Sequence, residues 1–261
     1  MTKLYNSKAR ALQLEEVEEP LDRLIPVALS RKAQRRSFQA ALEGAQGPAI
    51  IAEVKRASPS AGIIDEDFDP VMIAERYEMS RCDAISVITE SDHFLGELAF
   101  LDVVRNVTSK PVLRKDFIWT EYQVIQSAAH GADALLLIVA GLPAMRLREM
   151  LTACKQWDID ALVEVHGSDE LELAQRCGAR LIGINNRNLR SFHTDISITE
   201  DLLPYVADEA IVISESGFRD ASQVARLYNS GVKGFLIGET FMRSAEPAAA
   251  IATFKYCVTP A

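Results

Sequence analysis

The chain has 261 residues and a formal net charge of −9, and 48% of its residues are hydrophobic and 25% are charged. This composition is ordinary for a globular protein, and the negative charge argues against a nucleic-acid-binding or membrane-surface protein. The four cysteines and four histidines have no paired or metal-ligand spacing, and the N-terminus has no apolar signal core. We therefore expect a cytoplasmic protein without disulfides or a metal site.

The first 47 residues show no strand pattern, and we expect them to form an N-terminal helical extension. Met1–Pro26 is charged and loosely patterned, which fits either a helix or a mobile flap. Ser30–Glu43 is basic and amphipathic, which predicts one helix that ends before Gly44 and Gly47. Because it precedes the first strand, this helix would cover the bottom of a barrel or reach over a site.

From residue 48 onward the chain repeats a short apolar strand, a polar loop and a helical pattern. Asp69 is suited to cap the start of a helix whose first turn contains Pro70, and Thr120–Gln123 matches a capping box at the start of another helix. Three helix ends are followed by a glycine that can take the left-handed conformation, at Gly131, Gly178 and Gly231. The expected strands are Ala49–Lys55, Ala84–Thr89, Val112–Lys115, Ala134–Val139, Asp160–Val165, Leu181–Asn185, Ala210–Ser214 and Gly234–Ile237.

Eight strand–helix units in about 210 residues predict a single (β/α)8 TIM barrel over residues 48–261. Residues 1–47 would be an extension of the same structural domain. A doubly wound open sheet is the alternative, but no Gly-x-Gly-x-x-Gly follows the first strand.

Polar side chains gather at the ends of the expected strands, where a barrel carries its function. For any single residue, a salt bridge that only caps the barrel explains the pattern equally well. For the whole set, structural salt bridges are a less convincing explanation, because burying so many charged groups costs folding free energy unless they have a role. Lysines would lower the pKa of neighbouring carboxylates and burial would lower that of the lysines, which suits acid/base chemistry on a carbonyl compound. The residues are Glu53, Lys55, Thr89, Lys115, Asp116, Glu164, Asn185, Glu215, Ser216, Gly238 and Glu239.

Glycines at the ends of the last two strands predict a phosphate site. Gly217 and Gly238 lie where barrel enzymes often hold a phosphate at a short helix. Ser58 follows the first strand, which adjoins the last one in a closed barrel. The alternative is that these glycines serve only tight turns.

Seven longer motifs follow one another along the chain. They are Ile51-Ala-Glu-Val-Lys-Arg-Ala-Ser-Pro-Ser60, Ser86-Val-Ile-Thr-Glu90 with Phe94 and Gly96, Pro111-Val-Leu-Arg-Lys-Asp-Phe117, Leu162-Val-Glu-Val-His166, Ile182-Gly-Ile-Asn-Asn-Arg187, Ser214-Glu-Ser-Gly217 and Gly238-Glu-Thr-Phe-Met242. Together they resemble the indole-3-glycerol-phosphate synthase family. The similarity runs from about Ser37 to Arg243 in the family's order. It implies a TIM barrel that closes the ring of 1-(2-carboxyphenylamino)-1-deoxyribulose 5-phosphate, with loss of CO₂ and water, in tryptophan biosynthesis.

The resemblance also implies roles for individual residues. Lys115 would be the general acid at the ribulose carbonyl, Glu164 the acid/base of the later dehydration, and Lys55 the partner of the anthranilate carboxylate. Glu53 would hold both lysines, Asn185 would bind a substrate hydroxyl, and Glu215 and Ser216 would complete the polar ring. The phosphate would lie at Ser58, Gly217, Gly238 and the Glu239 amide. Phe94, Phe117 and Leu189 would form an apolar slot above Leu135–Ile138, and Arg187 would contact substrate.

Three departures from the family pattern stand outside this acid/base set: the weak apolar pattern of residues 1–28, Glu97 and Asn188. The nearest alternative is another cofactor-free phosphosugar barrel such as a phosphoribosylanthranilate isomerase, which needs one acid and one base rather than two lysines. A scaffolding barrel without activity is a second alternative, although Lys115 and Glu164 are both present. We expect a phosphosugar substrate, no cofactor, no nucleic-acid or membrane partner, and a monomer or weak homodimer.

Overall fold

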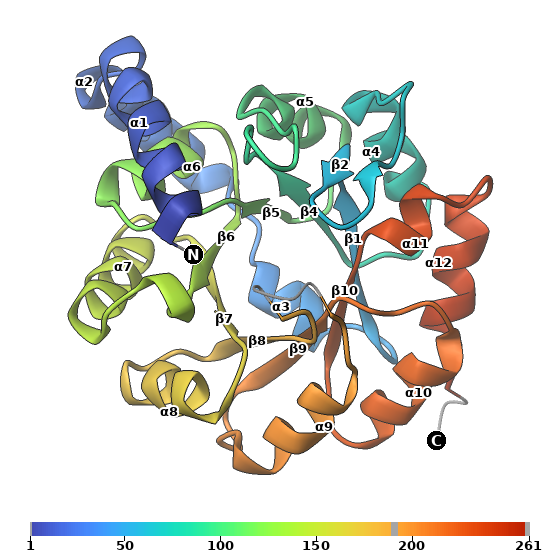
Figure 1. Ribbon diagram of the computed structural model, residues 1–261. Helices are drawn as coiled ribbons and strands as arrows, with labels where there is room; N and C mark the ends of the chain where they lie inside the picture. Colours follow the sequence, from blue (N-terminus) through green and yellow to red (C-terminus); the bar gives the residue numbers. More distant parts are fainter. Residues whose placement is uncertain (1, 189–192, 259–261) are drawn as a thin grey trace.

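The computed structural model describes residues 2–188 and 193–258. Eight parallel strands pair in a closed ring, in the order β1-β10-β9-β8-β7-β6-β5-β4. Helices surround the ring (Figure 1), which confirms the predicted (β/α)8 barrel. The strands are β1 (Ala49–Val54), β4 (Ala84–Ile88), β5 (Val112–Lys115), β6 (Ala134–Ile138), β7 (Asp160–Val165), β8 (Leu181–Asn185), β9 (Ile211–Glu215) and β10 (Gly234–Ile237).

The α-helices are α1 (Thr2–Glu18), α2 (Leu21–Arg31), α3 (Phe38–Glu43), α4 (Pro70–Glu78), α5 (Ala99–Val107), α6 (Glu121–Ala129), α7 (Ala144–Gln156), α8 (Ser168–Arg176), α9 (Ser197–Leu202), α10 (Ala221–Asn229), α11 (Glu239–Met242) and α12 (Pro247–Lys255). Short 3₁₀ helices are η1 (Lys32–Gln34), η2 (Val139–Gly141) and η3 (Leu203–Tyr205). Residues beyond β1 form a small antiparallel hairpin of β2 (Ala57–Ser58) and β3 (Gly62–Ile63). Among the described helices, none has the length and apolar character needed to cross a bilayer.

Local sequence explains where the barrel helices begin and end. The Asp69 side chain accepts hydrogen bonds from Val71 N and Met72 N, and Thr120 forms a capping box with Gln123. The three predicted stop glycines have positive φ, of 83° at Gly131, 91° at Gly178 and 112° at Gly231. A side chain is strained in this conformation, so glycine there ends each helix and turns the chain into the next strand.

Alternate residues of each strand face the barrel interior. On β1, Ala49 and Ile51 belong to the interior cluster, whereas Ile50, Ala52 and Val54 pack in the layer between the strands and the helices. The same period of two carries the inward side up to Glu53 at the end of the strand. Apolar side chains therefore fill the lower barrel, and polar ones occupy its carboxyl end.

Helix α3 closes the opposite end of the barrel. Phe38 and Leu42 have no exposed surface and join the interior cluster with residues at the beginnings of strands. Ser37 begins this helix, because its side chain accepts a hydrogen bond from Ala40 N. The expectation that this segment covers the bottom of the barrel is confirmed for α3 (Figure 1).

The expected single helix Ser30–Glu43 is wrong, because the chain divides it into the end of α2, η1 and α3. Two arginines between these elements bind carbonyls at the bottom of the barrel. Arg35 Nη1 donates to Ala132 O at 2.5 Å, and Arg36 Nη1 donates to Thr108 O at 2.7 Å. These tertiary hydrogen bonds hold the segment between η1 and α3 in a non-helical conformation.

Candidate active site

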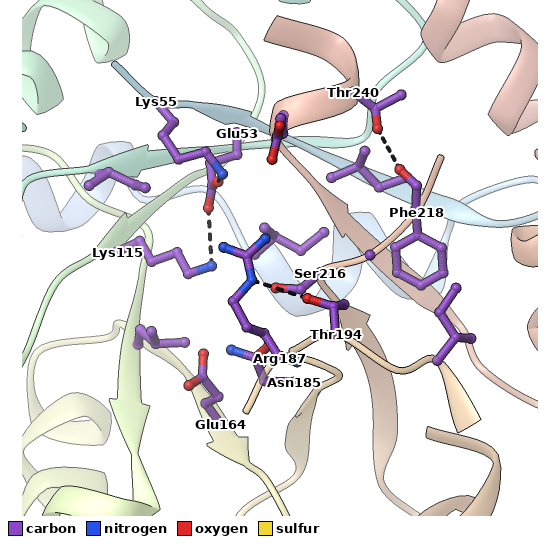
Figure 2. A pocket seen from close by; sticks show the side chains of 18 of the residues that line it. Glu53, Lys55, Lys115, Glu164, Asn185, Arg187, Thr194, Ser216, Phe218 and Thr240 are labelled. Atoms are coloured by element: carbon purple, nitrogen blue, oxygen red, sulfur yellow. Dashed lines mark hydrogen bonds and ion pairs between the residues drawn. The ribbon is translucent and has the colours of Figure 1, made fainter. Parts of the chain in front are cut away.

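A cavity of about 970 Å³ opens at the carboxyl ends of the barrel strands. Most of the residues predicted from the strand ends line it, together with several that were not predicted. The predicted ones are Glu53, Lys55, Phe94, Lys115, Asp116, Phe117, Glu164, Asn185, Arg187, Ser216, Gly217, Gly238 and Glu239. Figure 2 shows that Lys115 points toward Glu53 and that Glu164 reaches into the same space.

Glu53 is the anionic centre of this cavity. Its Oε1 lies 2.7 Å from Lys55 Nζ and its Oε2 lies 3.0 Å from Lys115 Nζ (Figure 2). Burial alone would raise the pKa of Glu53, but Lys115 and Lys55 lower it to about 2. The carboxylate is therefore ionised at neutral pH and holds both ammonium groups within reach of the cavity.

The pKa of Lys115 changes in the direction opposite to our expectation. Burial does act to lower it, but the carboxylates of Glu53, Glu215 and Glu164 raise it above its ordinary value. Three surrounding anions outweigh desolvation, so this lysine stays a cation. It can donate hydrogen bonds to an oxygen that gains negative charge.

Glu215 differs from Glu53, although both contact Lys115. Its Oε2 lies 3.3 Å from Lys115 Nζ, and its side chain has no exposed surface. Burial raises the pKa of Glu215 to about 7, Glu164 adds to the rise, and Lys115 opposes it. Gly183 on β8 makes room for this carboxyl group, because a Cβ at that position would collide with Glu215 Oε1.

Glu164 extends from β7 opposite these groups. Burial would raise its pKa, but the pKa lies below the ordinary value because His166, Lys115 and Asn185 stabilise the carboxylate. His166 Nε2 lies 3.2 Å from Glu164 Oε1. The spacing Glu164-x-His166 was the sequence signal for this contact, but our sequence reasoning gave His166 no role.

The loops beyond β8 and β9 form the other side of the cavity. Arg187 Nε donates to Thr194 Oγ1 at 3.3 Å within this loop (Figure 2). Arg187 Nη1 also donates to Ser60 Oγ at 2.9 Å, so the side chain ties the loop to the hairpin. Ser216 and Gly217 follow β9 with φ of 71° and 92°. The Ser216 carbonyl accepts a hydrogen bond from Asn186 Nδ2 at 3.0 Å, which holds this uncommon backbone.

The structure explains why residue 238 is a glycine, and sequence reasoning did not give this explanation. A Cβ there would collide with Glu53 Oε1 and lie 2.9 Å from Lys55 Nζ. The glycine therefore leaves room for the Glu53–Lys55 pair, whatever else binds beside it.

Four predicted residues are not among those that line the cavity, namely Ser58, Thr89, Glu215 and Leu189. Thr89 is buried, and its Oγ1 donates to Asp116 Oδ2 at 2.7 Å. Ser58 is buried in the hairpin, where its Oγ accepts from Ala61 N at 3.2 Å, and Glu215 lies behind Lys115. Leu189 lies outside the described residues. The lining residues that were not predicted include Thr194, Phe218, Arg219, Thr240 and Arg243. They come from the loops beyond β8 and β9 and from α11 with its C-cap, segments that barrel closure brings together. Thr240 Oγ1, for example, donates to Phe218 O at 2.5 Å (Figure 2).

One group of described residues has ligand atoms close enough to hold a metal ion, namely Glu90, Asp92 and His93. However, Glu90 Oε2 accepts hydrogen bonds from the backbone N–H of His93 and of Phe94, and its Oε1 accepts from Asp92 N. This carboxylate therefore already serves to close the turn after β4.

Comparison with known proteins gives one consistent family. A sequence profile of indole-3-glycerol phosphate synthases matches residues 1–254. The indole-3-glycerol phosphate synthase of Alkaliphilus metalliredigens is 43% identical over 244 residues, which cover 94% of this chain and 93% of the relative. That of Thermoanaerobacter pseudethanolicus is 48% identical over 198 residues, which cover 76% of each chain.

Solved structures confirm the fold class alone. The 3-hexulose-6-phosphate synthase of Salmonella typhimurium superposes with a TM-score of 0.64 at 12% identity, covering 80% of this chain and 97% of that one. KGPDC from Streptococcus mutans superposes with a TM-score of 0.61 at 15% identity, covering 81% of this chain and 97% of the other.

Proposed function

The chain belongs to the indole-3-glycerol phosphate synthase family, and on this premise we propose the reaction that its cavity performs. The substrate is 1-(2-carboxyphenylamino)-1-deoxyribulose 5-phosphate. A carbon–carbon bond forms between the aryl carbon that carries the carboxylate and the ribulose carbonyl carbon. The carboxylate leaves as CO₂ and the carbonyl oxygen leaves as water, which gives indole-3-glycerol phosphate.

Lys115 acts at the carbonyl in the first step. Attack by an aryl carbon turns the ketone oxygen into an alkoxide, and this step is faster when a cation and a proton donor already lie beside that oxygen. Lys115 Nζ lies 3.0 Å from Glu53 and 3.3 Å from Glu215. Between these carboxylates the ammonium group stays charged, and it is fixed at the edge of the cavity.

Lys55 binds the carboxylate of the anthranilate part. It lies two residues beyond Glu53 on the same inward side of the strand end, and it pairs with Glu53 at 2.7 Å. A carboxylate bound here lies next to the carbonyl at Lys115, so the two reacting carbons are held close together. Loss of CO₂ then restores the aromatic ring.

Glu164 serves the dehydration. After decarboxylation, the former carbonyl oxygen must leave as water and a proton must leave the neighbouring carbon. Glu164 is ionised, lines the cavity and lies across from Lys115, so it can accept that proton. Asn185 contacts Glu164 and lines the cavity beside it, and we assign it to a substrate hydroxyl.

The two ends of the substrate lie in different parts of the cavity. The aromatic ring occupies an apolar region made by Phe94, Phe117, Leu136 and Ile138. The phosphate lies at Gly217, Gly238 and the amide of Glu239, with the nearby Arg219 as a cation that offsets the negative net charge of the protein. Ser58 has no part in this assignment, because it does not line the cavity.

The observation that carries the proposal is the pairing of both Lys55 and Lys115 with the one carboxylate of Glu53 inside the cavity. The test is to mix the protein with the carboxyphenylamino-deoxyribulose phosphate and to follow indole fluorescence. In parallel, phosphoribosylanthranilate is offered as substrate. We expect indole formation with the first compound and no turnover of the second. Turnover of phosphoribosylanthranilate alone would instead support the isomerase.

A further inference from the structure

His166 lies between two carboxylates just beyond the end of β7. Its Nε2 is 3.2 Å from Glu164 Oε1, and its Nδ1 is 3.2 Å from Glu170 Oε2. Glu170 lies in the first turn of α8 and also accepts a hydrogen bond from the backbone N–H of His166 at 2.9 Å. The imidazole is therefore held from the helix side and presented to Glu164 on its other edge.

This arrangement favours the imidazolium form. A neutral imidazole has one N–H group, so one of its nitrogens would direct a lone pair at a carboxylate. In the imidazolium both nitrogens carry a proton, and each then faces a negative oxygen. Burial opposes the charge, but Glu164 and Glu170 raise the pKa of His166 to about 10. The ring is therefore a cation at neutral pH.

His166 contacts the cavity only through Glu164. It is not among the described residues that line the cavity, whereas Glu164 is. The carboxyl group of Glu215 also interacts with Glu164, and it disfavours the ionised form of Glu164 by repulsion. Lys55 pairs with Glu53, and Lys115 pairs with Glu53 and Glu215, whereas the imidazolium supplies a positive charge to Glu164 from behind the site.

We propose that His166 and Glu170 are positioning residues, in which the imidazole, anchored by Glu170, fixes the orientation of the Glu164 carboxylate and keeps it ionised as a proton acceptor. The inference rests on the proposed role of Glu164 in the dehydration. The groups that act on this carboxylate are His166 from its own strand end, Asn185 from β8 and Lys115 from β5, and the group that acts on the ring is Glu170 from α8.

The test is the pH dependence of kcat in His166→Gln and Glu170→Gln. An opposite charge within about 4–6 Å lowers a carboxyl pKa by roughly 1–3 units. His166→Gln should therefore move the acidic limb of the kcat profile upward by about one unit or more. Because the carboxylate also loses its fixed orientation, kcat should fall about tenfold near neutral pH, with KM within about twofold of the wild type. Glu170→Gln should shift the limb in the same direction by less.

The control is Glu172→Gln on the same helix, whose exposed pair with Arg176 faces solvent. It should leave the profile unchanged. If His166→Gln fails to fold, the pH profile of Glu170→Gln still tests the inference. The Glu170 carboxyl group is partly exposed, so its replacement should be tolerated by the fold. Unchanged acidic limbs in both variants would overturn the inference.

The variant Glu164→Gln distinguishes a failure of the positioning role from a failure of the proposed catalytic role of Glu164. If that variant is inactive while both positioning variants behave as wild type, the positioning role alone is wrong. If Glu164→Gln retains full turnover, the catalytic assignment of Glu164 is wrong, and the positioning role is overturned with it.

Discussion

Replacing Glu215 with glutamine should stabilise the protein at alkaline pH. Glu215 has no exposed surface, and its pKa is raised from 4.5 to about 7. A carboxyl group with a raised pKa binds more protons in the folded state between these values, so folding stability falls as pH rises through this window. Each pKa unit corresponds to about 1.4 kcal/mol, which gives a cost of about 3 kcal/mol above pH 7.

Glutamine keeps the shape and can accept a hydrogen bond from Lys115, but it never ionises. The free energy of unfolding of Glu215→Gln relative to wild type should therefore rise by about 2–3 kcal/mol between pH 5 and pH 8. Urea denaturation at both pH values measures this difference. The exposed Glu209→Gln is the control and should change stability by less than about 0.5 kcal/mol at either pH. A difference for Glu215→Gln that does not vary with pH would refute the reasoning.

Three further substitutions test other contacts. Lys55→Ala should raise KM, because the substrate carboxylate loses its counter-ion; a normal KM with collapsed kcat would move the general-acid role to Lys55. Lys8→Met removes the buried ion pair of Lys8 with Asp116, just after β5, whose atoms lie 3.1 Å apart, and should lower the free energy of unfolding measured in urea by about 2 kcal/mol. The control Lys32→Met removes an exposed ion pair and should cost less than about 0.5 kcal/mol. Gly238→Ala should lower kcat as well as substrate affinity, because its Cβ would displace Glu53; an effect on KM alone, in steady-state kinetics, would contradict this.

The barrel was predictable because its local signals agree with each other. Every predicted strand of the barrel matches an observed one to within one residue at each end. Buried apolar runs mark the strands, capping residues such as Asp69 mark the helix starts, and glycines such as Gly131 mark the helix ends. The period of two along β1 also places Glu53 and Lys55 on the same inward side, and the two side chains pair.

The remaining features depend on contacts between segments far apart in the chain. Arg35 breaks the predicted N-terminal helix because it binds the carbonyl of Ala132, and no local pattern announces that partner. The pKa of Lys115 depends on three carboxyl groups from three different strands, so the expectation based on burial alone had the wrong direction. Ser58 carries a hydroxyl suited to a phosphate, but its Oγ accepts a hydrogen bond from Ala61 N within the hairpin, and it is not among the described residues that line the cavity.

The most direct test of the proposed mechanism measures CO₂ release and indole formation together in Lys115→Met and Glu164→Gln. Loss of a general acid or base usually lowers turnover by about 10²-fold or more. Lys115→Met should lose both products, because ring closure precedes decarboxylation. Glu164→Gln should still release CO₂ from bound substrate but should form indole-3-glycerol phosphate at least about 10²-fold more slowly. Near-normal turnover by Lys115→Met, or loss of CO₂ release in Glu164→Gln, would contradict the assignment of the two steps.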